Sequence, residues 1–396
     1  MKGCEIMRID IDSAKRVKDL PPYLFAEIDE MIEQAKDNGV DVINFGIGDP
    51  DLPTPDHIVN AMKEAVMDPA THSYPSYEGM IEYRKAVANW YEERFSVDID
   101  PATEVISLIG SKEGLANFPL CYINPGDLAL IPDPSYPVYK TAVLLAGGET
   151  ISLPLKTEND FLVDLDSVKN EYLNKAKLIY LNYPNNPTGA IADRSFFKKI
   201  VDYAQEYNFI VVHDAAYSEI GLDGYQPPSL LEVEGAREVG IEFGSLSKTF
   251  NMTGWRIGWV LGNSEIIDTL STIKTNIDSG VFEAIQRAGI TALKGDKTCV
   301  DDTISIYEKR RDLLVSGLNK IGWDIEPNIA SFYLWMGIPE NFSDSKEFSQ
   351  YIFEKTGVFF TPGIGYGEEG KNYVRIALTV SEDRIKEALK RLEEEF

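Results

Sequence analysis

Short apolar runs rich in Val, Ile and Leu alternate along the chain with longer stretches of mixed polarity. Most of these runs are almost continuously apolar, which is typical of strands covered on both faces. The runs predicted as strands are Glu104–Ile109, Asp127–Ile131, Thr150–Leu153, Lys177–Leu181, Phe209–His213 and Gly240–Gly244. The stretches predicted as helices between them include Ser111–Tyr122, Ser135–Ala146 and Asp193–Tyr207. This alternation predicts an α/β architecture with a mostly parallel central sheet.

The pattern changes toward the C-terminus, where charged amphipathic helices are predicted at Thr303–Ile321 and Ser381–Phe396, with strands at Ile329–Met336 and Tyr373–Thr379. That combination predicts a smaller α+β domain. Near the N-terminus a single helix is predicted around Leu24–Asp37, in a segment without a core of its own, so this segment must pack on another part of the protein. The predicted division is an arm and part of the small domain over 1–44, a large cofactor-binding domain over 45–295 and the C-terminal small domain over 296–396.

The chain of 396 residues has 64 acidic and 38 basic residues and a formal net charge of −26. An acidic surface repels phosphodiester backbones, so we expect no nucleic-acid partner. No apolar run approaches the roughly 20 residues of a membrane-spanning helix. Residues 1–20 also lack the apolar stretch of a signal peptide. We therefore expect a soluble, cytoplasmic protein with no membrane partner.

Cysteine and histidine do not indicate a metal centre. The three cysteines, Cys4, Cys121 and Cys299, are far apart, which argues against a disulfide framework or a zinc cluster. The three histidines have no metal-ligand spacing, so no metal is expected. A Gly-x-Gly-x-x-Gly pattern at 365–370 precedes a predicted strand rather than a helix, so we interpret it as a flexible loop and not as a nucleotide site.

Three segments place chemically active side chains directly after predicted strands. Lys248 and Arg256 follow one strand, Asp214 follows a second, and Asn186 lies in a turn-forming segment after a third. A deprotonated lysine condenses with carbonyl groups, and arginine with nearby serines suits a phosphate. A carboxylate that ends an apolar strand needs a cationic partner. Because ligands bind at the carboxyl ends of the strands in open α/β sheets, these side chains are predicted to share one site.

The order of these motifs resembles that of one protein family. The first two motifs are an Asn-Pro-Thr-Gly turn that contains Asn186 and an Asp-x-x-Tyr pair formed by Asp214 and Tyr217. The third is a Ser-x-Ser-Lys segment that ends at Lys248 and is followed eight residues later by an arginine. The fourth is Arg375 in the segment Tyr-Val-Arg-Ile-Ala. Together they resemble the class I and II pyridoxal-phosphate-dependent aminotransferases of fold type I. The similarity covers nearly the whole chain and implies a large domain with a mostly parallel sheet and a smaller α+β domain.

The resemblance implies pyridoxal 5'-phosphate as cofactor and a role for each matching residue. Lys248 would bind the cofactor covalently and move the substrate proton, and Asp214 would pair with the protonated ring nitrogen. Asn186 and Tyr217 would contact the phenolic oxygen. The other implied cofactor contacts come from Ser111, Lys112, Ser245, Ser247 and Arg256 at the phosphate, from Tyr136 on the ring face, and from Tyr74 of a neighbouring subunit.

The implied substrates are a small amino acid and a 2-oxo acid, held by the α-carboxylate. Arg375 would clamp that group with two parallel hydrogen bonds. Gly48 would offer a backbone N–H, and Gly46 would permit the local turn. The residues that we predict to read the distal end of the substrate are Tyr23 and Glu78, and Asn276 is predicted to bind substrate by reaching the site of the neighbouring subunit. Because the family's site is shared between two subunits, a homodimer is expected.

Within the family, the segments 45–51, 110–114 and 247–255 are most similar to the LL-diaminopimelate aminotransferases. The implied reaction is a ping-pong transfer of an amino group from LL-2,6-diaminopimelate to 2-oxoglutarate, which yields tetrahydrodipicolinate and glutamate for lysine biosynthesis. One alternative is an aminotransferase for alanine, aspartate or aromatic amino acids. Another is a pyridoxal-phosphate-dependent C–S lyase. A non-catalytic regulator of this fold is disfavoured by the acidic charge and by the lack of a helix-turn-helix extension.

Overall fold

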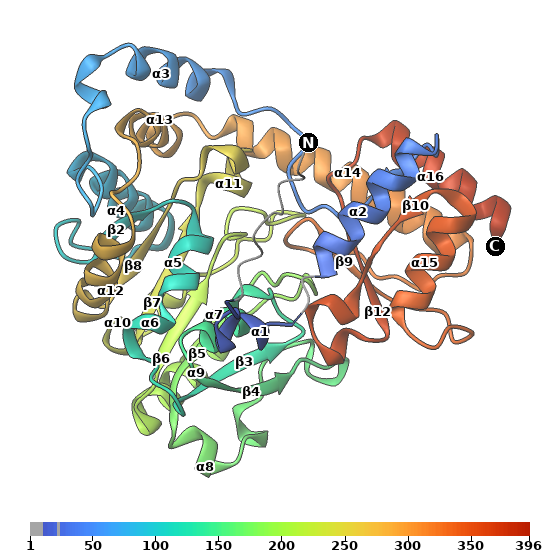
Figure 1. Cartoon of the computed structure of the whole chain (residues 1–396). Helices are drawn as coiled ribbons and strands as arrows, with labels where there is room; N and C mark the ends of the chain where they lie inside the picture. The colour runs from blue at the N-terminus through green and yellow to red at the C-terminus, as the bar shows by residue number, and fades with distance from the viewer. Residues whose placement is uncertain (1–10, 22–23) are drawn as a thin grey trace, which may run out of the picture.

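The computed structural model describes residues 11–21 and 24–396. A larger part built on one sheet lies beside a smaller part that contains the C-terminus (Figure 1). The long helix α14 (Thr298–Lys320) connects them. Its first turn packs in the core of the larger part through Val300, and its later turns pack in the smaller core through Tyr307 and Leu314.

The larger part contains a seven-stranded sheet. Its strands, in spatial order, are β2 (Val105–Leu108), β8 (Gly258–Gly262), β7 (Gly240–Ser245), β6 (Ile210–Asp214), β5 (Ala176–Leu181), β3 (Leu128–Asp133) and β4 (Glu149–Pro154). All run in one direction except β8, which pairs antiparallel with both β2 and β7. This confirms the predicted fold with a mostly parallel sheet. The sequence pattern missed β8, because glycines at both of its ends shorten the apolar run.

Helices cover both faces of the sheet, and alternating strand residues reach opposite layers. Ile179 and Val211 pack in one layer, while their neighbours Tyr180 and Val212 pack in the other. The first layer contains α4 (Ile81–Phe95), α9 (Arg194–Tyr207) and α13 (Glu283–Lys294), with α3 (Asp56–Val66) against α13. The second contains α5 (Ser111–Asn117), α7 (Val138–Leu145) and α12 (Ser264–Ile277). Shorter helices are α1 (Lys15–Lys18), α6 (Pro119–Tyr122), α8 (Asn170–Leu173), α10 (Ala236–Val239) and α11 (Leu246–Thr249).

Two helix predictions need correction. The helix predicted over 111–122 is divided into α5 and α6, because Pro119 has no N–H with which to continue the hydrogen-bond ladder. The helix predicted from Ser135 begins only at Val138, because Pro137 at its N-cap has no N–H and disfavours helical backbone in the residue before it. The glycine-rich segment forms two 3₁₀ turns, Gly363–Tyr366 and Glu368–Gly370, before the expected strand.

The smaller part is the expected α+β unit. Its antiparallel sheet has the order β11 (Thr361–Pro362), β12 (Tyr373–Ala377) and β9 (Tyr333–Gly337), and its other helices are α15 (Ser345–Thr356) and α16 (Glu382–Glu395). The N-terminal segment packs on this part. Ile32 of α2 (Leu24–Asp37) contacts the same cluster as Phe359, and β1 (Ile43–Asn44) pairs parallel with β10 (Val358–Phe359). The boundaries after residues 44 and 295 stay predictions.

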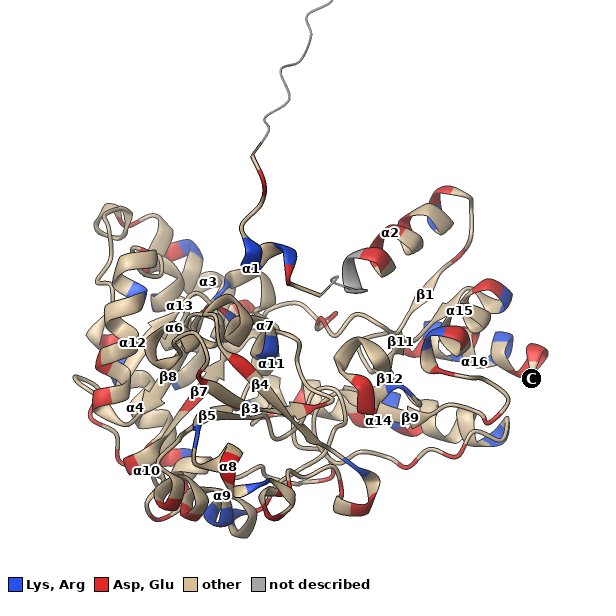
Figure 2. Ribbon diagram, turned by 60° about the horizontal axis from the view of Figure 1, so that its bottom comes forward, with Lys and Arg blue, Asp and Glu red and all other residues tan. Residues whose placement is uncertain are grey.

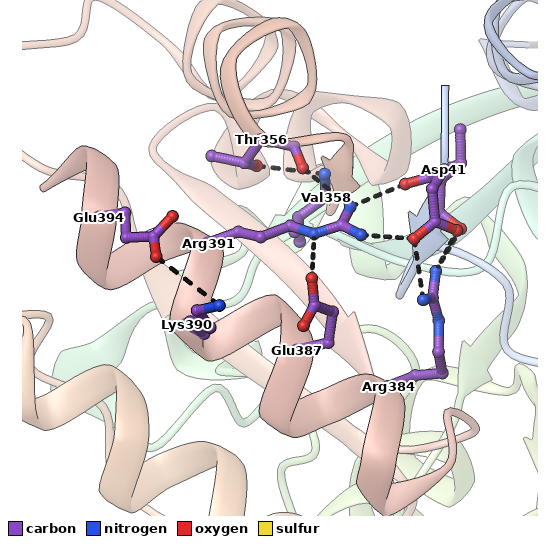
Figure 3. A network of polar contacts seen from close by, with 9 residues as sticks. Asp41, Thr356, Val358, Arg384, Glu387, Lys390, Arg391 and Glu394 are labelled. Carbon is purple, nitrogen blue, oxygen red and sulfur yellow. Dashed lines mark hydrogen bonds and ion pairs between the residues drawn. The ribbon is translucent and has the colours of Figure 1, made fainter. Parts of the chain in front are cut away.

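A polar network fastens this N-terminal segment to the C-terminal helix (Figure 3). The carboxylate of Asp41 accepts hydrogen bonds from Arg384 at 2.6 and 2.9 Å and forms an ion pair with Arg391. Arg391 also donates to the carbonyl of Asp41 at 2.8 Å and to that of Thr356 at 3.2 Å. Hydrogen bonds from the two arginines lower the pKa of Asp41 to about 2.

Acidic residues are spread over the outer helices of both parts, including α2 and α16 (Figure 2). Within residues 11–21 and 24–396, we find no helix long and apolar enough to cross a membrane. The same residues contain no cluster of three or more His, Cys, Asp or Glu side chains that could hold a metal ion.

Candidate active site

A cavity of about 580 Å³ opens at the carboxyl ends of β5, β6 and β7. One wall belongs to the larger part, and the opposite wall comes from residues 47–49 and from Tyr333, Tyr366 and Arg375 of the smaller part. The predicted site residues that line it are Gly48, Ser111, Lys112, Tyr136, Asn186, Asp214, Tyr217, Ser245, Ser247, Lys248, Arg256 and Arg375. Residues scattered over more than 300 positions therefore meet in one cavity.

Lys248 lies in α11, immediately after β7. The Oγ of Ser245 caps that helix by accepting the N–H of Ser247 at 3.1 Å. The Nζ of Lys248 donates to the carbonyl of Gly48 at 3.0 Å. Burial lowers the pKa of Lys248 to about 8, although the negative charge of Asp49 opposes this shift. The side chain is therefore an amine that loses its proton close to neutral pH.

Asp214, the last residue of β6, is only 5% exposed. Its Oδ2 accepts from the hydroxyl of Tyr139 at 2.7 Å, and its main-chain oxygen accepts from Nδ2 of Asn182 at 2.7 Å. Burial raises the pKa of Asp214, and the Tyr139 hydrogen bond acts in the opposite direction. Such a carboxylate is stable as an anion when a cationic group joins it.

Arg375 on β12 reaches across the cavity to the larger part. Its guanidinium donates to Oδ1 of Asn186 at 2.8 Å and to the carbonyl of Gly46 at 2.7 Å. It lies 4.1 Å from the ring centre of Tyr333 and 4.9 Å from that of Tyr366. The Nε of Arg375 is buried and has no hydrogen-bond partner among the described residues. An unsatisfied guanidinium edge suits a planar carboxylate.

Two buried tyrosines meet beside the lysine. The hydroxyl oxygens of Tyr217 and Tyr333 are 3.1 Å apart, and burial raises the pKa of Tyr217 well above its ordinary value. A side chain at Gly48 would collide with the Tyr333 hydroxyl, so only glycine allows this close approach. Gly46 is packed in the same way against Phe359, whereas the substrate contact predicted for the N–H of Gly48 stays a prediction.

Cations and hydroxyls gather at one end of the cavity. Ser111 begins α5, directly after Gly110, whose φ of +74° lies in the region that favours glycine. A side chain at Gly110 would collide with the guanidinium of Arg256. Arg256 donates to the carbonyl of Thr253 at 2.9 Å, and Nζ of Lys112 lies 5.7 Å from the ring centre of Tyr136. With Ser245 and Ser247, this end of the cavity has the donors that a phosphate needs.

Three described residues that were predicted for the site do not join Lys248 in this chain. Tyr74 is 88% exposed, Glu78 lies 3.4 Å from Arg84, and Asn276 donates to a carbonyl of its own helix at 2.9 Å. All three are exposed, and none of them lines the cavity. Tyr23 lies outside the described residues. Their roles require a second subunit or other data, so they stay predictions.

Several lining residues were missed by sequence reasoning. They are Asp49, Tyr139, Asn182, Tyr333 and Tyr366. Asn182 begins the same turn that carries Asn186, so its place after a strand was a usable signal. The tyrosines gave no comparable signal. Tyr139 lies inside a predicted helix, Tyr333 inside a predicted strand and Tyr366 in the predicted glycine-rich loop, and aromatic residues at such positions ordinarily serve packing.

A buried contact between His213 and Glu242 supports the sheet behind the cavity. His213 Nδ1 lies 2.8 Å from Oε2 of Glu242, and both side chains are fully buried. Glu242 also accepts hydrogen bonds from the hydroxyls of Tyr91 and Ser229, at 2.8 Å each. His213 thus supports the sheet rather than the site, because its ring contacts Glu242 of the adjacent strand and does not line the cavity.

These groups fit a phosphorylated aldehyde cofactor with a basic ring nitrogen. The cavity supplies an amine of lowered pKa, a buried carboxylate, and a cationic end lined with hydroxyls. The guanidinium of Arg375, whose Nε has no hydrogen-bond partner among the described residues, is available for a substrate carboxylate. The fold and the site thus define a pyridoxal-phosphate-dependent enzyme of fold type I.

Comparison with known proteins identifies the family. The family described as aminotransferase class I and II matches residues 40–392. The LL-diaminopimelate aminotransferase of Halothermothrix orenii is 63% identical over 96% of this chain and 98% of its own length, and that of Syntrophobacter fumaroxidans is 54% identical over 96% and 97%. Substrate-bound BacF from Bacillus subtilis has a TM-score of 0.94 at 37% identity, over 97% of this chain and 98% of that chain. The chain therefore belongs to the class I and II aminotransferases, which use pyridoxal phosphate.

Proposed function

We propose that the protein transfers an amino group from LL-2,6-diaminopimelate to 2-oxoglutarate, yielding tetrahydrodipicolinate and glutamate for lysine biosynthesis. The observation that carries this proposal is the identity of 63% and 54%, over nearly full length, to enzymes named for that substrate. The geometry supports this proposal, because the amine of Lys248, the carboxylate of Asp214 and the guanidinium of Arg375 line one cavity. An aminotransferase for alanine, aspartate or aromatic amino acids would use the same central residues and is the main competitor.

The cofactor supplies a carbonyl group and an electron-withdrawing ring, and the protein supplies the remaining chemistry. Lys248, with its lowered pKa, is the base that removes the proton from the substrate α-carbon. Asp214 would hold the ring nitrogen, while Tyr217 and Asn186 would hold the phenolic oxygen. The phosphate binds at the end of the cavity that contains Arg256.

Arg375 orients the substrate by its α-carboxylate. Two nitrogens of its guanidinium donate to Asn186 and to the carbonyl of Gly46, which hold the group in place, while Nε has no partner among the described residues. The ring of Tyr333, 4.1 Å away, supports its face. Arg375 and Lys248 line the same cavity, so a substrate held by its carboxylate at Arg375 would lie in the cavity that contains the reactive amine.

The active enzyme is a cytoplasmic homodimer in this proposal. Tyr74 from one subunit would contact the cofactor phosphate of the other, which accounts for a tyrosine that is 88% exposed in the single chain. Glu78, Asn276 and Tyr23 would read the distal ammonium and carboxylate of the substrate from the same shared entrance.

A panel of amino donors tests the substrate. The cofactor-loaded enzyme is mixed with LL-, meso- and DD-diaminopimelate, alanine, aspartate and phenylalanine, and the loss of the oxidised cofactor form is followed by absorbance. We expect the LL isomer to react fastest. Equal or faster reaction with alanine or aspartate would overturn the substrate assignment. Release of pyruvate from cystathionine would instead indicate a C–S lyase.

Subunit complementation tests the shared site. A Lys248→Ala chain and a Tyr74→Ala chain are each weakly active or inactive alone in this proposal. Mixing them by reversible denaturation would form hybrid dimers that contain one intact site, with lysine from one chain and tyrosine from the other. Recovery of activity above either parent supports the shared dimer, whereas no recovery in verified hybrids contradicts it.

A further inference from the structure

Tyr139 is a buried tyrosine that the proposed mechanism does not use. Its hydroxyl donates to Oδ2 of Asp214 at 2.7 Å, and its side chain is fully buried while still lining the cavity. The other carboxylate oxygen, Oδ1, accepts a longer hydrogen bond of 3.3 Å from the N–H of Ala216. The hydrogen bond from Tyr139 is therefore the shorter of the two restraints on this carboxylate.

The ring of Tyr139 is itself held from two sides. It stacks on Tyr180, with ring centres 4.8 Å apart and planes 9° from parallel. The hydroxyl of Tyr180 points away from the carboxylate and donates to the main-chain carbonyl of Leu115 at 2.9 Å. On the other side, Tyr139 meets the edge of Tyr136 at 5.8 Å and 85°. A ring fixed in this way can direct its hydroxyl to only one place.

The charges on the two partners fix the direction of the hydrogen bond. Burial and the adjacent Asp214 raise the pKa of Tyr139 well above its ordinary value, so its hydroxyl remains a donor throughout the working pH range. Donation to the carboxylate stabilises the anionic form of Asp214 and opposes the effect of burial. The same contact also restricts rotation of the carboxylate about its last bond.

We propose that Tyr139 is a positioning residue that orients the Asp214 carboxylate toward the ring nitrogen of pyridoxal phosphate before the cofactor binds. This inference rests on the role given to Asp214 in the proposed function. It does not depend on which amino acid is the substrate. Tyr180 has no such role in the proposal, because its hydroxyl serves a main-chain carbonyl.

The experiment compares two cofactors that differ only at the ring nitrogen. Apoprotein is titrated with pyridoxal phosphate and with its 1-deaza analogue, in which a C–H group replaces the nitrogen, and both dissociation constants are measured. The selectivity is the dissociation constant of the analogue divided by that of pyridoxal phosphate. For Tyr139→Phe we expect this ratio to fall about tenfold, the size of one hydrogen bond to a charged group. The phenylalanine keeps the ring stack.

Tyr180→Phe is the matched control, because it removes one buried hydroxyl from the same stack. Its selectivity is expected to equal that of the wild type. A ratio that is unchanged in Tyr139→Phe, or lowered equally in both variants, would overturn the proposal. So would a wild type without any preference for the ring nitrogen.

A double-mutant cycle tests whether Tyr139 acts through the carboxylate of Asp214. In an Asp214→Asn background the carboxylate is gone, so adding Tyr139→Phe should leave the selectivity ratio unchanged. A second fall in the ratio would contradict action through Asp214. Neither measurement uses an amino donor, so the test of Tyr139 remains valid even if the substrate assignment is wrong.

Discussion

The Nζ of Lys248 donates a hydrogen bond of 3.0 Å to the main-chain oxygen of Gly48, which lies 200 positions earlier in the chain. Lys248 stands at the edge of the large sheet, whereas the segment that contains Gly48 is held by the smaller part. Thr379 donates to the carbonyl of Ile47 at 2.7 Å, and Arg375 donates to that of Gly46 at 2.7 Å. The two parts of the molecule thus meet at the reactive amine.

Replacement of Lys248 by alanine should abolish transamination. We expect a loss of about a thousandfold or more, because the variant lacks both the covalent anchor and the base. Borohydride treatment followed by mass spectrometry should show the cofactor attached to the wild type and absent from the variant. Lys297→Ala is the control, since burial also lowers the pKa of Lys297, but its Nζ donates to the carbonyl of Ala292 at 2.8 Å outside the cavity. Intact transamination in Lys248→Ala would refute the proposed mechanism.

The attachment of cofactor to apoprotein should become faster as the pH rises and level off above about 8. Burial lowers the pKa of Lys248 from 10.5 to about 8, so the reactive neutral amine predominates above that value. Stopped-flow absorbance over a pH series would give the midpoint. Asp49→Asn should move the midpoint to lower pH, because the charge of Asp49 raises the pKa of Lys248.

The neighbouring acid provides the control for this pH series. Asp51 accepts hydrogen bonds from Arg310 at 2.7 and 2.8 Å and does not line the cavity. Asp51→Asn should therefore leave the midpoint in place if the variant remains folded. A wild-type midpoint near 10.5 would show that burial does not activate Lys248.

Arg375→Lys should weaken the binding of both substrates while the protein still takes up cofactor. Lysine keeps the charge but loses the planar pair of donors, so we expect KM for the amino donor and for the oxo acid to rise by about 10- to 100-fold. Steady-state kinetics for each half-reaction measures this. The control is Arg287→Lys, because Arg287 pairs with Asp68 at 2.7 Å outside the cavity. Unchanged KM values in Arg375→Lys would exclude the clamp.

Asp41→Asn should lower the melting temperature at pH 7 by loosening the N-terminal segment from α16. The pKa of Asp41 falls from 3.8 to about 2 in the folded protein, so its stabilisation is present above about pH 4 and is lost as the pH falls toward 2. The difference between wild type and variant should therefore shrink in acid. It should also shrink in 1 M salt, which screens exposed charges.

Asp37→Asn is the comparison for that measurement. Asp37 is exposed, and among the described residues no ion pair is found for it. Its replacement should change the melting temperature little. If the difference in melting temperature between wild type and Asp41→Asn stays constant from pH 7 to pH 3, the two arginines do not act through the charge of Asp41.

Much of the site could be predicted because its residues follow strands. Asn186, Asp214 and Lys248 each come shortly after an apolar run, and parallel strands bring such positions to one edge. The tyrosine contacts could not be predicted in this way. Tyr139 is 75 positions from Asp214, and nothing in its local pattern distinguishes it from Tyr180, which serves only a main-chain carbonyl.

The sequence by itself determined the class of fold, the family and the order of the reactive groups, because strand periodicity and short motifs are local properties of the chain. Tertiary structure decided which groups touch. Only the packed chain places Gly48 against Lys248, Asn186 against Arg375, and Tyr139 against Asp214. The physical reason is that burial and long-range hydrogen bonds set both the orientation and the pKa of these groups, and neither is encoded in residue spacing.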